Sequence, residues 1–191
     1  MATEIELKAH IDNHEALKNI LGEKAEYLSS FKKEDRYYFL PEHSDRFPSG
    51  VRVRREKRTF PDGMEKSTSN VTYKRKEVRE GIEVNDEREF EVRTAEEFEE
   101  FLGRLGFKPG DAKKKRGWAF CRNGINAELV EVEGLGWFVE LEIIADGSYT
   151  ATPTEGAFTE ERNRLLVFLD SLGVSKEAIE SRFYSQMLRG L

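Results

Sequence analysis

The chain has 191 residues, of which 38% are hydrophobic, so it can bury one sizeable core and we expect a single domain over residues 1–191. Charged residues make up 36%, yet the formal net charge is only -6, which argues weakly against general binding to nucleic acid or membrane surfaces. The single cysteine, Cys121, excludes an internal disulfide framework and is typical of a reducing compartment. No apolar run approaches the roughly 20 residues of a membrane span, and no signal peptide precedes the first motif. A cytoplasmic location is therefore predicted.

Three stretches of the chain share one plan, a Glu-x-Glu strand followed by an amphipathic helix that closes at Leu-Gly. The strands are predicted at 4–8, 89–93 and 139–143, and the helices at 12–22, 94–106 and 159–173. Asp12 and Thr94 stand where an N-cap residue is expected, each with an acidic residue three positions later. Gly22, Gly106 and Gly173 stand where a left-handed residue commonly ends a helix.

Further strands are predicted between these units, at 37–40, 51–55, 71–76, 113–120 and 125–132. Residues 56–70 are polar and contain Pro and Gly, so they are interpreted as a loop or a long hairpin connection. A short C-terminal helix is predicted within 175–188. Seven or eight short strands with a few helices indicate an α+β fold, a mostly antiparallel sheet or barrel with helices packed on the outside.

Charges of one sign recur at every second position of six predicted strands. Because side chains alternate across a strand, each pair shares one face. The basic pairs are Arg52 with Arg54, Lys74 with Lys76, and Lys114 with Arg116; the acidic pairs are Glu4 with Glu6, Glu89 with Glu91, and Glu140 with Glu142. A solvated face usually mixes signs, whereas these are sorted strand by strand. The pattern favours a hydrated channel in which carboxylates bind a hard divalent cation and basic groups hold a chain of phosphates; an ordinary solvated surface is the alternative.

These motifs resemble, in order, those of the CYTH superfamily, also called triphosphate tunnel metalloenzymes. The matching residues span nearly the whole chain: Glu4-x-Glu6-x-Lys8, Asp35-x-Tyr37, Arg52-x-Arg54, Lys74-x-Lys76, Glu89-x-Glu91, Lys114-x-Arg116, the GLGWFVELE stretch at 134–142, and Tyr184 followed by Gln186-Met187-Leu188. The resemblance implies one CYTH-like domain, a closed eight-stranded antiparallel β-barrel that forms a tunnel with helices packed on the outside.

The resemblance also implies an enzyme that binds a triphosphate with Mg²⁺ or Mn²⁺ inside that tunnel. The implied metal ligands are Glu4, Glu6, Glu89, Glu91, Glu140 and Glu142. The implied substrate clamp is Lys8, Arg52, Arg54, Lys74, Lys76, Lys114 and Arg116, with Lys8 also a candidate for assisting the attacking water. Hydrolysis of inorganic or organic triphosphate is the favoured reaction, and some family members pair as homodimers.

Two alternatives stay open. A class IV adenylyl cyclase would use the same groups to convert ATP to cyclic AMP and pyrophosphate, although the His-Phe pair common ahead of ExExK in those enzymes is absent here. A non-catalytic polyphosphate- or nucleotide-binding module would follow if Val130, which stands where many members carry an acidic residue, marks a lost metal ligand. Glu128 shares the face of Val130 and could compensate. Asp35, Tyr37 and Tyr184 could tune the site or only pack.

Overall fold

The computed structural model describes residues 2–41, 50–145 and 155–190, with the backbone alone at 2, 3, 74–77, 86, 145 and 155. The described strands are β1 (Ala2–His10), β2 (Glu26–Phe39), β3 (Val51–Thr59), β4 (Glu65–Arg79), β5 (Ile82–Val92), β6 (Lys108–Arg122), β7 (Ile125–Val132) and β8 (Gly136–Ala145). The described α-helices are α1 (His14–Lys24), α2 (Ala95–Arg104), α3 (Glu155–Ser171) and α4 (Tyr184–Leu188), with a 3₁₀ turn at Lys176–Ala178.

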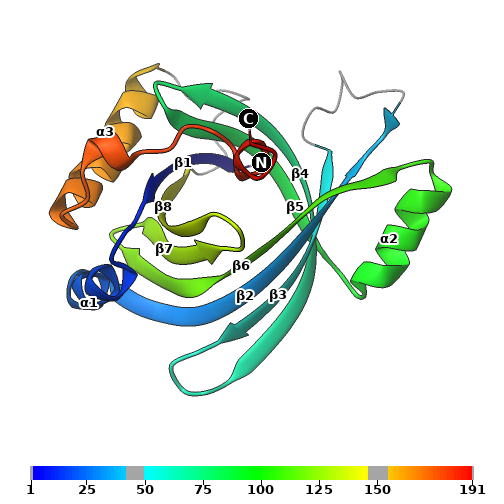
Figure 1. The fold of residues 1–191 in the computed structure, drawn as a ribbon, viewed down its shortest axis with the longest axis horizontal. Helices are drawn as coiled ribbons and strands as arrows, with labels where there is room; N and C mark the ends of the chain where they lie inside the picture. Colours follow the sequence, from blue (N-terminus) through cyan, green and yellow to red (C-terminus); the bar gives the residue numbers. More distant parts are fainter. Residues whose placement is uncertain (1, 42–49, 146–154, 191) are drawn as a thin grey trace.

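The strands pair in the order β1-β5-β4-β3-β2-β6-β7-β8, and β8 returns to pair with β1, so they form an antiparallel ring around a central space (Figure 1). Alternation along each strand separates two kinds of side chain. On β1, Ile5 and Leu7 are each 1% exposed and pack in the outer core, while Glu4 and Glu6 line the central space. On this strand the outer face is therefore apolar and the inner face charged.

The pairing corrects the predicted closed eight-stranded barrel with helices packed on the outside. β1 pairs with β5 only from Ala2 to Glu6, because β5 begins at Ile82, whereas its pairing with β8 continues to His10. Beyond β5, the C-terminal segment takes the vacated edge: Ala9 bridges Ile179, and the Glu180 amide donates to the Lys8 carbonyl at 2.9 Å. The eight strands alone thus do not close the ring along its whole length.

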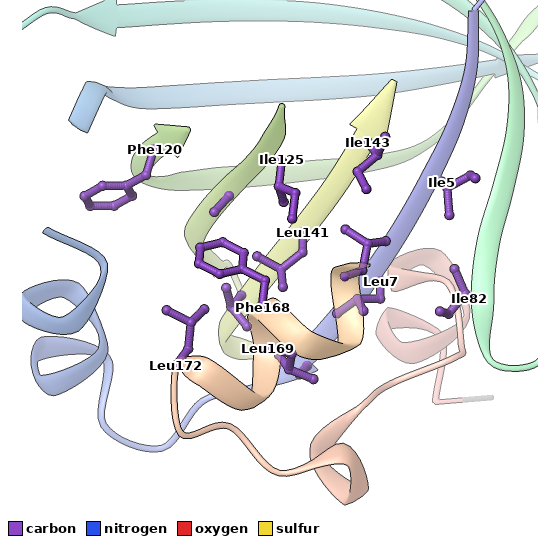
Figure 2. Packing of buried hydrophobic residues seen from close by; sticks show 14 of the residues in the cluster. Ile5, Leu7, Ile82, Phe120, Ile125, Leu141, Ile143, Phe168, Leu169 and Leu172 are labelled. Atoms are coloured by element: carbon purple, nitrogen blue, oxygen red, sulfur yellow. The ribbon is translucent and has the colours of Figure 1, made fainter. Parts of the chain in front are cut away.

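The helical cover is also partial. α3 packs Phe168, Leu169 and Leu172 against outward-facing residues of β1, β7 and β8, as Figure 2 shows, and α1 adds Leu17 and Leu21 to the same cluster. Each such side chain contributes about 1.5–3 kcal/mol when fully buried. On the other side of the ring, α2 covers apolar residues of β3 and β4 (Figure 1). The fourth helix, α4, does not pack on the outside; its first residue, Tyr184, lines the central cavity.

Several local predictions need correction. α1 is capped by Asn13, whose side chain accepts from the Ala16 amide at 3.0 Å, rather than by Asp12. Gly22 lies inside α1, whereas Gly106 and Gly173 do adopt positive φ. Residues 56–70 do form a hairpin between β3 and β4, one of the two predicted alternatives, but most of them are strand rather than loop, since β3 continues to Thr59 and β4 begins at Glu65. Among the described residues, no helix is long and apolar enough to cross a membrane.

Candidate functional site

The central cavity has a volume of about 1170 Å³ and is lined by the inner faces of the strands and by α4. Its basic lining residues come mainly from three adjacent strands, with Arg52, Arg54 and Arg58 on β3, Lys33 on β2, and Lys113 and Lys115 on β6. Its acidic lining residues are Glu4, Glu6, Glu56, Glu83, Glu87, Glu89, Asp111, Glu128, Glu140 and Glu142. The strand order therefore gives the one cavity a side that is rich in cations and a side that is rich in carboxylates.

The strand register stacks the cations in levels. Asp35 on β2 lies opposite Arg54 on β3 and Lys113 on β6. One level along, Lys33 lies opposite Lys115 on β6. Glu56 on β3 lies opposite Lys33 on its other side. Like charges placed directly opposite each other destabilise a sheet, and with two lysines and one glutamate this level gains from further counter-charges.

Carboxylates two strands along the ring supply those counter-charges. Lys33 Nζ lies 2.6 Å from both carboxylate oxygens of Glu128 on β7. Lys115 Nζ lies 2.5 Å from Glu140 Oε1 on β8. Lys8 on β1 is also paired with a glutamate, since its Nζ lies 2.5 Å from Oε1 of Glu83 on the neighbouring strand β5. Three lysines of the inner face are therefore each held by one glutamate.

The Asp35 and Arg54 pair encloses its carboxylate completely. Arg54 donates from Nε to Oδ1 at 2.6 Å and from Nη2 to Oδ2 at 2.9 Å, and the Asp35 side chain is 0% exposed. Burial alone would raise the pKa of Asp35, but Arg54 and Lys113 outweigh it and hold that pKa well below its usual range. Asp35 therefore stays ionised and orients the Arg54 guanidinium.

Burial acts differently on the two lysine pairs. It lowers the pKa of Lys33, and the attraction of Glu128 offsets this only in part. For Lys115, burial is outweighed by Glu140 and Glu6, which raise its pKa, and in return Lys115 lowers the pKa of Glu140 against the effect of burial. Lys115 and Glu140 are therefore both charged at neutral pH.

Tyr184 of α4 stands over the cationic side of the cavity. Its ring centroid lies 4.6 Å from Lys115 Nζ, 5.2 Å from Lys113 Nζ and 5.4 Å from Lys8 Nζ. Burial and the nearby Glu140 carboxylate raise the pKa of Tyr184 well above its usual value, so the phenol is neutral. The ring offers its face to three cations at once, a favourable cation–π arrangement.

Most of the predicted site residues lie on the inner face. Those that line the cavity are Glu4, Glu6, Arg52, Arg54, Glu89, Glu140 and Glu142. Lys8 is only 2% exposed and lies behind Glu83 and Tyr184 rather than at the cavity surface. The side chains of Lys74 and Lys76 fall outside the described residues.

Three predicted residues lie elsewhere, and their assignment is corrected. Lys114 and Arg116 occupy the outer face of β6, where Arg116 pairs with Glu131, because the inner face of that strand carries Lys113 and Lys115. The predicted clamp on β6 was therefore out of register by one residue. Glu91, near the end of β5, is exposed and does not line the cavity.

The sequence prediction missed Lys33, Lys113, Lys115 and Glu83. On β6 a usable signal exists, since Trp118 and Phe120 pack with the outer core, as bulky apolar residues do on β1. Alternation from Trp118 places Lys114 and Arg116 outside, and Lys113 and Lys115 inside. Lys33 carried no such signal, because it stands in the run Lys32-Lys33-Glu34-Asp35, which has charges on both faces.

Val130 lies in a small apolar cluster with Phe138 and Tyr184 and is fully buried. Glu128, two residues earlier, shares its inner face and is engaged by Lys33. Val130, which stands where an acidic residue was expected from the family resemblance, therefore packs against Tyr184 of α4.

The inner carboxylates suit a hard divalent cation in kind. Glu6 lies opposite Glu83 on β5 and Glu142 on β8. The buried Asn85 donates to Glu4, while its own Oδ1 has no donor in the part of the chain that the structure describes. Oxygen donors of this type fit Mg²⁺ or Mn²⁺. Among the described residues, however, no three acidic, histidine or cysteine side chains are assembled into a ready metal site.

Comparison with known proteins places this fold. No family model matches the chain. A protein of Methanocaldococcus jannaschii named "Putative adenylate cyclase MJ0240" is 28% identical over 98% of this chain and 99% of its own length. The structure of the PH1012 protein from Pyrococcus horikoshii is 30% identical, covers 95% of this chain and 96% of its own, and superposes with a TM-score of 0.71. The chain belongs to the CYTH, or triphosphate tunnel, family.

A third protein, of lower sequence identity, has a similar fold. The adenylyl cyclase homologue HpAC1 from Hippeastrum, described as having a dominant triphosphatase activity, is 16% identical, covers all of this chain and 96% of its own, and has a TM-score of 0.65. At that identity the CYTH fold is what the two proteins share.

Proposed function

We propose that this CYTH protein is an enzyme that binds a triphosphate-bearing substrate in the central cavity and hydrolyses it. The observation that carries the proposal is the convergence of Arg52, Arg54, Lys33, Lys113 and Lys115 on one cavity with carboxylates opposite. A chain of phosphates offers several negative oxygens in a row, and guanidinium and ammonium groups on adjacent strands match it.

Arg52 supports the proposal most directly. Its Nη2 donates to Thr72 at 2.8 Å and lies 3.2 Å from both Glu87 and Glu89, whereas its buried Nε has no acceptor among the described residues. A buried donor without an acceptor is costly, and a phosphate oxygen would satisfy it. Arg54, fixed by Asp35, would stand beside it as a preset second contact.

The remaining groups have assigned roles in this proposal. Lys113 and Lys115 would bind oxygens of the transferring or leaving phosphates and offset the charge that develops there. Glu4, Glu6, Glu140 and Glu142 would hold Mg²⁺ or Mn²⁺, which when bound would neutralise phosphate charge and orient the attacking water. The Lys8 ammonium is engaged by Glu83, so its contact with a phosphate and its assistance to the attacking water both stay predictions.

The second candidate is adenylyl cyclisation, favoured by the name of the Methanocaldococcus jannaschii relative. It would use the same cations and carboxylates but direct attack of the ribose 3′-hydroxyl on the α-phosphate. A binding module without turnover is the third reading, because Val130 replaces an acid on the inner face with apolar packing.

One product assay separates the three. The protein is incubated with tripolyphosphate and with ATP, with and without Mg²⁺ or Mn²⁺, and products are resolved by chromatography. Metal-dependent release of phosphate from either substrate is the expected result. Cyclic AMP with pyrophosphate would replace the proposal with cyclisation, and saturable binding without products would replace it with a binding module.

A further inference from the structure

The three lysine–glutamate pairs of the inner face each join a group suited to a phosphate with a group suited to a cation. Lys115 Nζ and Glu140 Oε1 are 2.5 Å apart, with side chains 7% and 9% exposed. Lys33 and Glu128 are joined at 2.6 Å, with side chains 6% and 18% exposed. At these distances each lysine occupies a carboxylate oxygen that a cation would need, and each carboxylate occupies a donor that a phosphate would need.

This mutual engagement bears on how the described carboxylates are arranged for a metal. The inner face carries carboxylates on β1, β5, β7 and β8, yet no three acidic, histidine or cysteine side chains of the described residues are assembled around one point. Glu128 and Glu140, which lie opposite each other on β7 and β8, are instead directed at Lys33 and Lys115 on β2 and β6. These two carboxylates are therefore turned toward ammonium groups.

We propose that the cavity takes up triphosphate and divalent cation together by exchange of ion pairs. A phosphate oxygen replaces Glu140 on Lys115, and the released Glu140 becomes a ligand for the cation; Lys33 and Glu128 act in the same way. Each ligand then removes the competitor of the other. This inference rests on the proposed function and adds the thermodynamic coupling between its two ligands.

The coupling follows from a cycle of binding free energies. A cation that binds Glu140 alone takes from the buried Lys115 ammonium the carboxylate that lies 2.5 Å away, and a phosphate that binds Lys115 alone takes from the buried Glu140 carboxylate its ammonium partner. Breaking a buried pair by removing one partner is strongly unfavourable. When both ligands bind, both buried groups regain partners. By linkage each ligand raises the affinity of the other by the same factor, about five-fold or more in typical coupled sites.

Single-ligand titrations of two variants test this without measuring turnover. Because Mn²⁺ binds tripolyphosphate in solution, each variant is given one ligand only. Lys115→Met keeps an unbranched apolar stem out to Cε and removes the ammonium, so Glu140 loses its ion-pair partner. Mn²⁺ alone, followed by calorimetry or electron paramagnetic resonance, should bind at least about five-fold more tightly to this variant than to the wild type. Glu140→Gln releases Lys115, so tripolyphosphate in EDTA should bind more tightly by a similar factor.

Lys114→Met is the matched control, because Lys114 neighbours Lys115 on β6 but lies on its outer face. Its affinities for Mn²⁺ and tripolyphosphate should equal those of the wild type. Circular dichroism checks that the variants fold. The Mn²⁺ titration and the tripolyphosphate titration use different variants, so if one variant does not fold the other still tests the inference. The inference is overturned if the folded variants bind their single ligand no more tightly than the wild type.

The outcome is separable from that of the proposed function. If the wild type releases no phosphate but both variants gain affinity, hydrolysis is wrong and the exchange of ion pairs stands. If the wild type hydrolyses tripolyphosphate and neither variant gains affinity, hydrolysis stands and the exchange is wrong.

Discussion

Asp35 and Arg54 face each other on adjacent strands β2 and β3 and form a two-point ion pair inside the ring, with donor–acceptor distances of 2.6 and 2.9 Å. The carboxylate is fully enclosed, and Lys113 Nζ approaches it to 3.5 Å from the other side. Because both Arg54 and Lys113 pair with Asp35, we assign Asp35 the role of positioning these two cations.

Replacing Asp35 with Asn should destabilise the protein by about 3 kcal/mol, because the buried Arg54 and Lys113 lose their common counter-charge. Urea denaturation at pH 7 measures the change in the free energy of unfolding. Glu100→Gln is the control: its pair with Arg104 is exposed, at 66% and 76%, and its loss should cost less than about 0.5 kcal/mol. Equal effects of the two substitutions would refute the role of Asp35. Added tripolyphosphate should restore more stability to Asp35→Asn than to the wild type.

The same pair predicts a pH dependence. The pKa of Asp35 is lower in the folded chain than its unfolded value of about 3.9, so the pair contributes its full stability above that value and loses it as the pH falls toward the folded pKa. The difference in free energy of unfolding between wild type and Asp35→Asn should be constant from pH 7 to about pH 5 and shrink below about pH 4. A difference that is unchanged between pH 7 and pH 3 would contradict the lowered pKa.

Gly117 sets a close contact in the wall of the ring. A Cβ at this position on β6 would lie 2.0 Å from the Leu129 carbonyl oxygen of β7, so Gly117→Ala must displace the neighbouring strand. We expect a loss of about 1–3 kcal/mol, the usual cost of overpacking. Gly103→Ala, in α2 with open space around it, should be neutral or stabilising. Thermal unfolding of both variants checks this, and a neutral Gly117→Ala would show that the strands have room to move.

Much of this arrangement could be predicted from the sequence, because on most strands one face is plainly apolar. On β1, Ile5 and Leu7 fix the outer face, and on β3 Val51 and Val53 do the same for α2, so the inward direction of Glu4, Glu6, Arg52 and Arg54 follows by alternation. Where this reference is missing, the prediction fails. Residues 113–116 are four consecutive cations, and alternation gives either pair with equal ease until Trp118 and Phe120 are used as the outer reference.

Other features depended on distant parts of the chain and had no local signal. The pairing of Lys33 with Glu128 joins β2 to β7 across 95 positions of sequence, and the Glu180 contact with β1 spans nearly the whole chain. Most of residues 56–70 are strand because their backbones pair across the β3–β4 hairpin. Polar side chains on both faces of a strand do not prevent this backbone pairing. These are tertiary outcomes that residue patterns do not encode.

Glu6→Gln should reduce metal-dependent turnover by at least about 100-fold, since it removes a carboxylate assigned to the cation, whose electrostatic contribution is several kcal/mol. The fold should remain, because Glu6 is only half-buried. Phosphate release at saturating Mn²⁺ measures the effect. Glu91→Gln, on an exposed residue outside the cavity, should retain wild-type turnover. Full activity of Glu6→Gln would remove Glu6 from the metal site.

The most direct test of the central claim, that the inner face of the ring holds the substrate, compares two neighbouring lysines of β6. The kcat/KM for tripolyphosphate hydrolysis is measured for Lys115→Gln and Lys114→Gln. We expect a loss of about 10- to 100-fold for the inward Lys115, the value of a charge-assisted hydrogen bond, and no loss for the outward Lys114. A loss for Lys114→Gln with full activity for Lys115→Gln would contradict it.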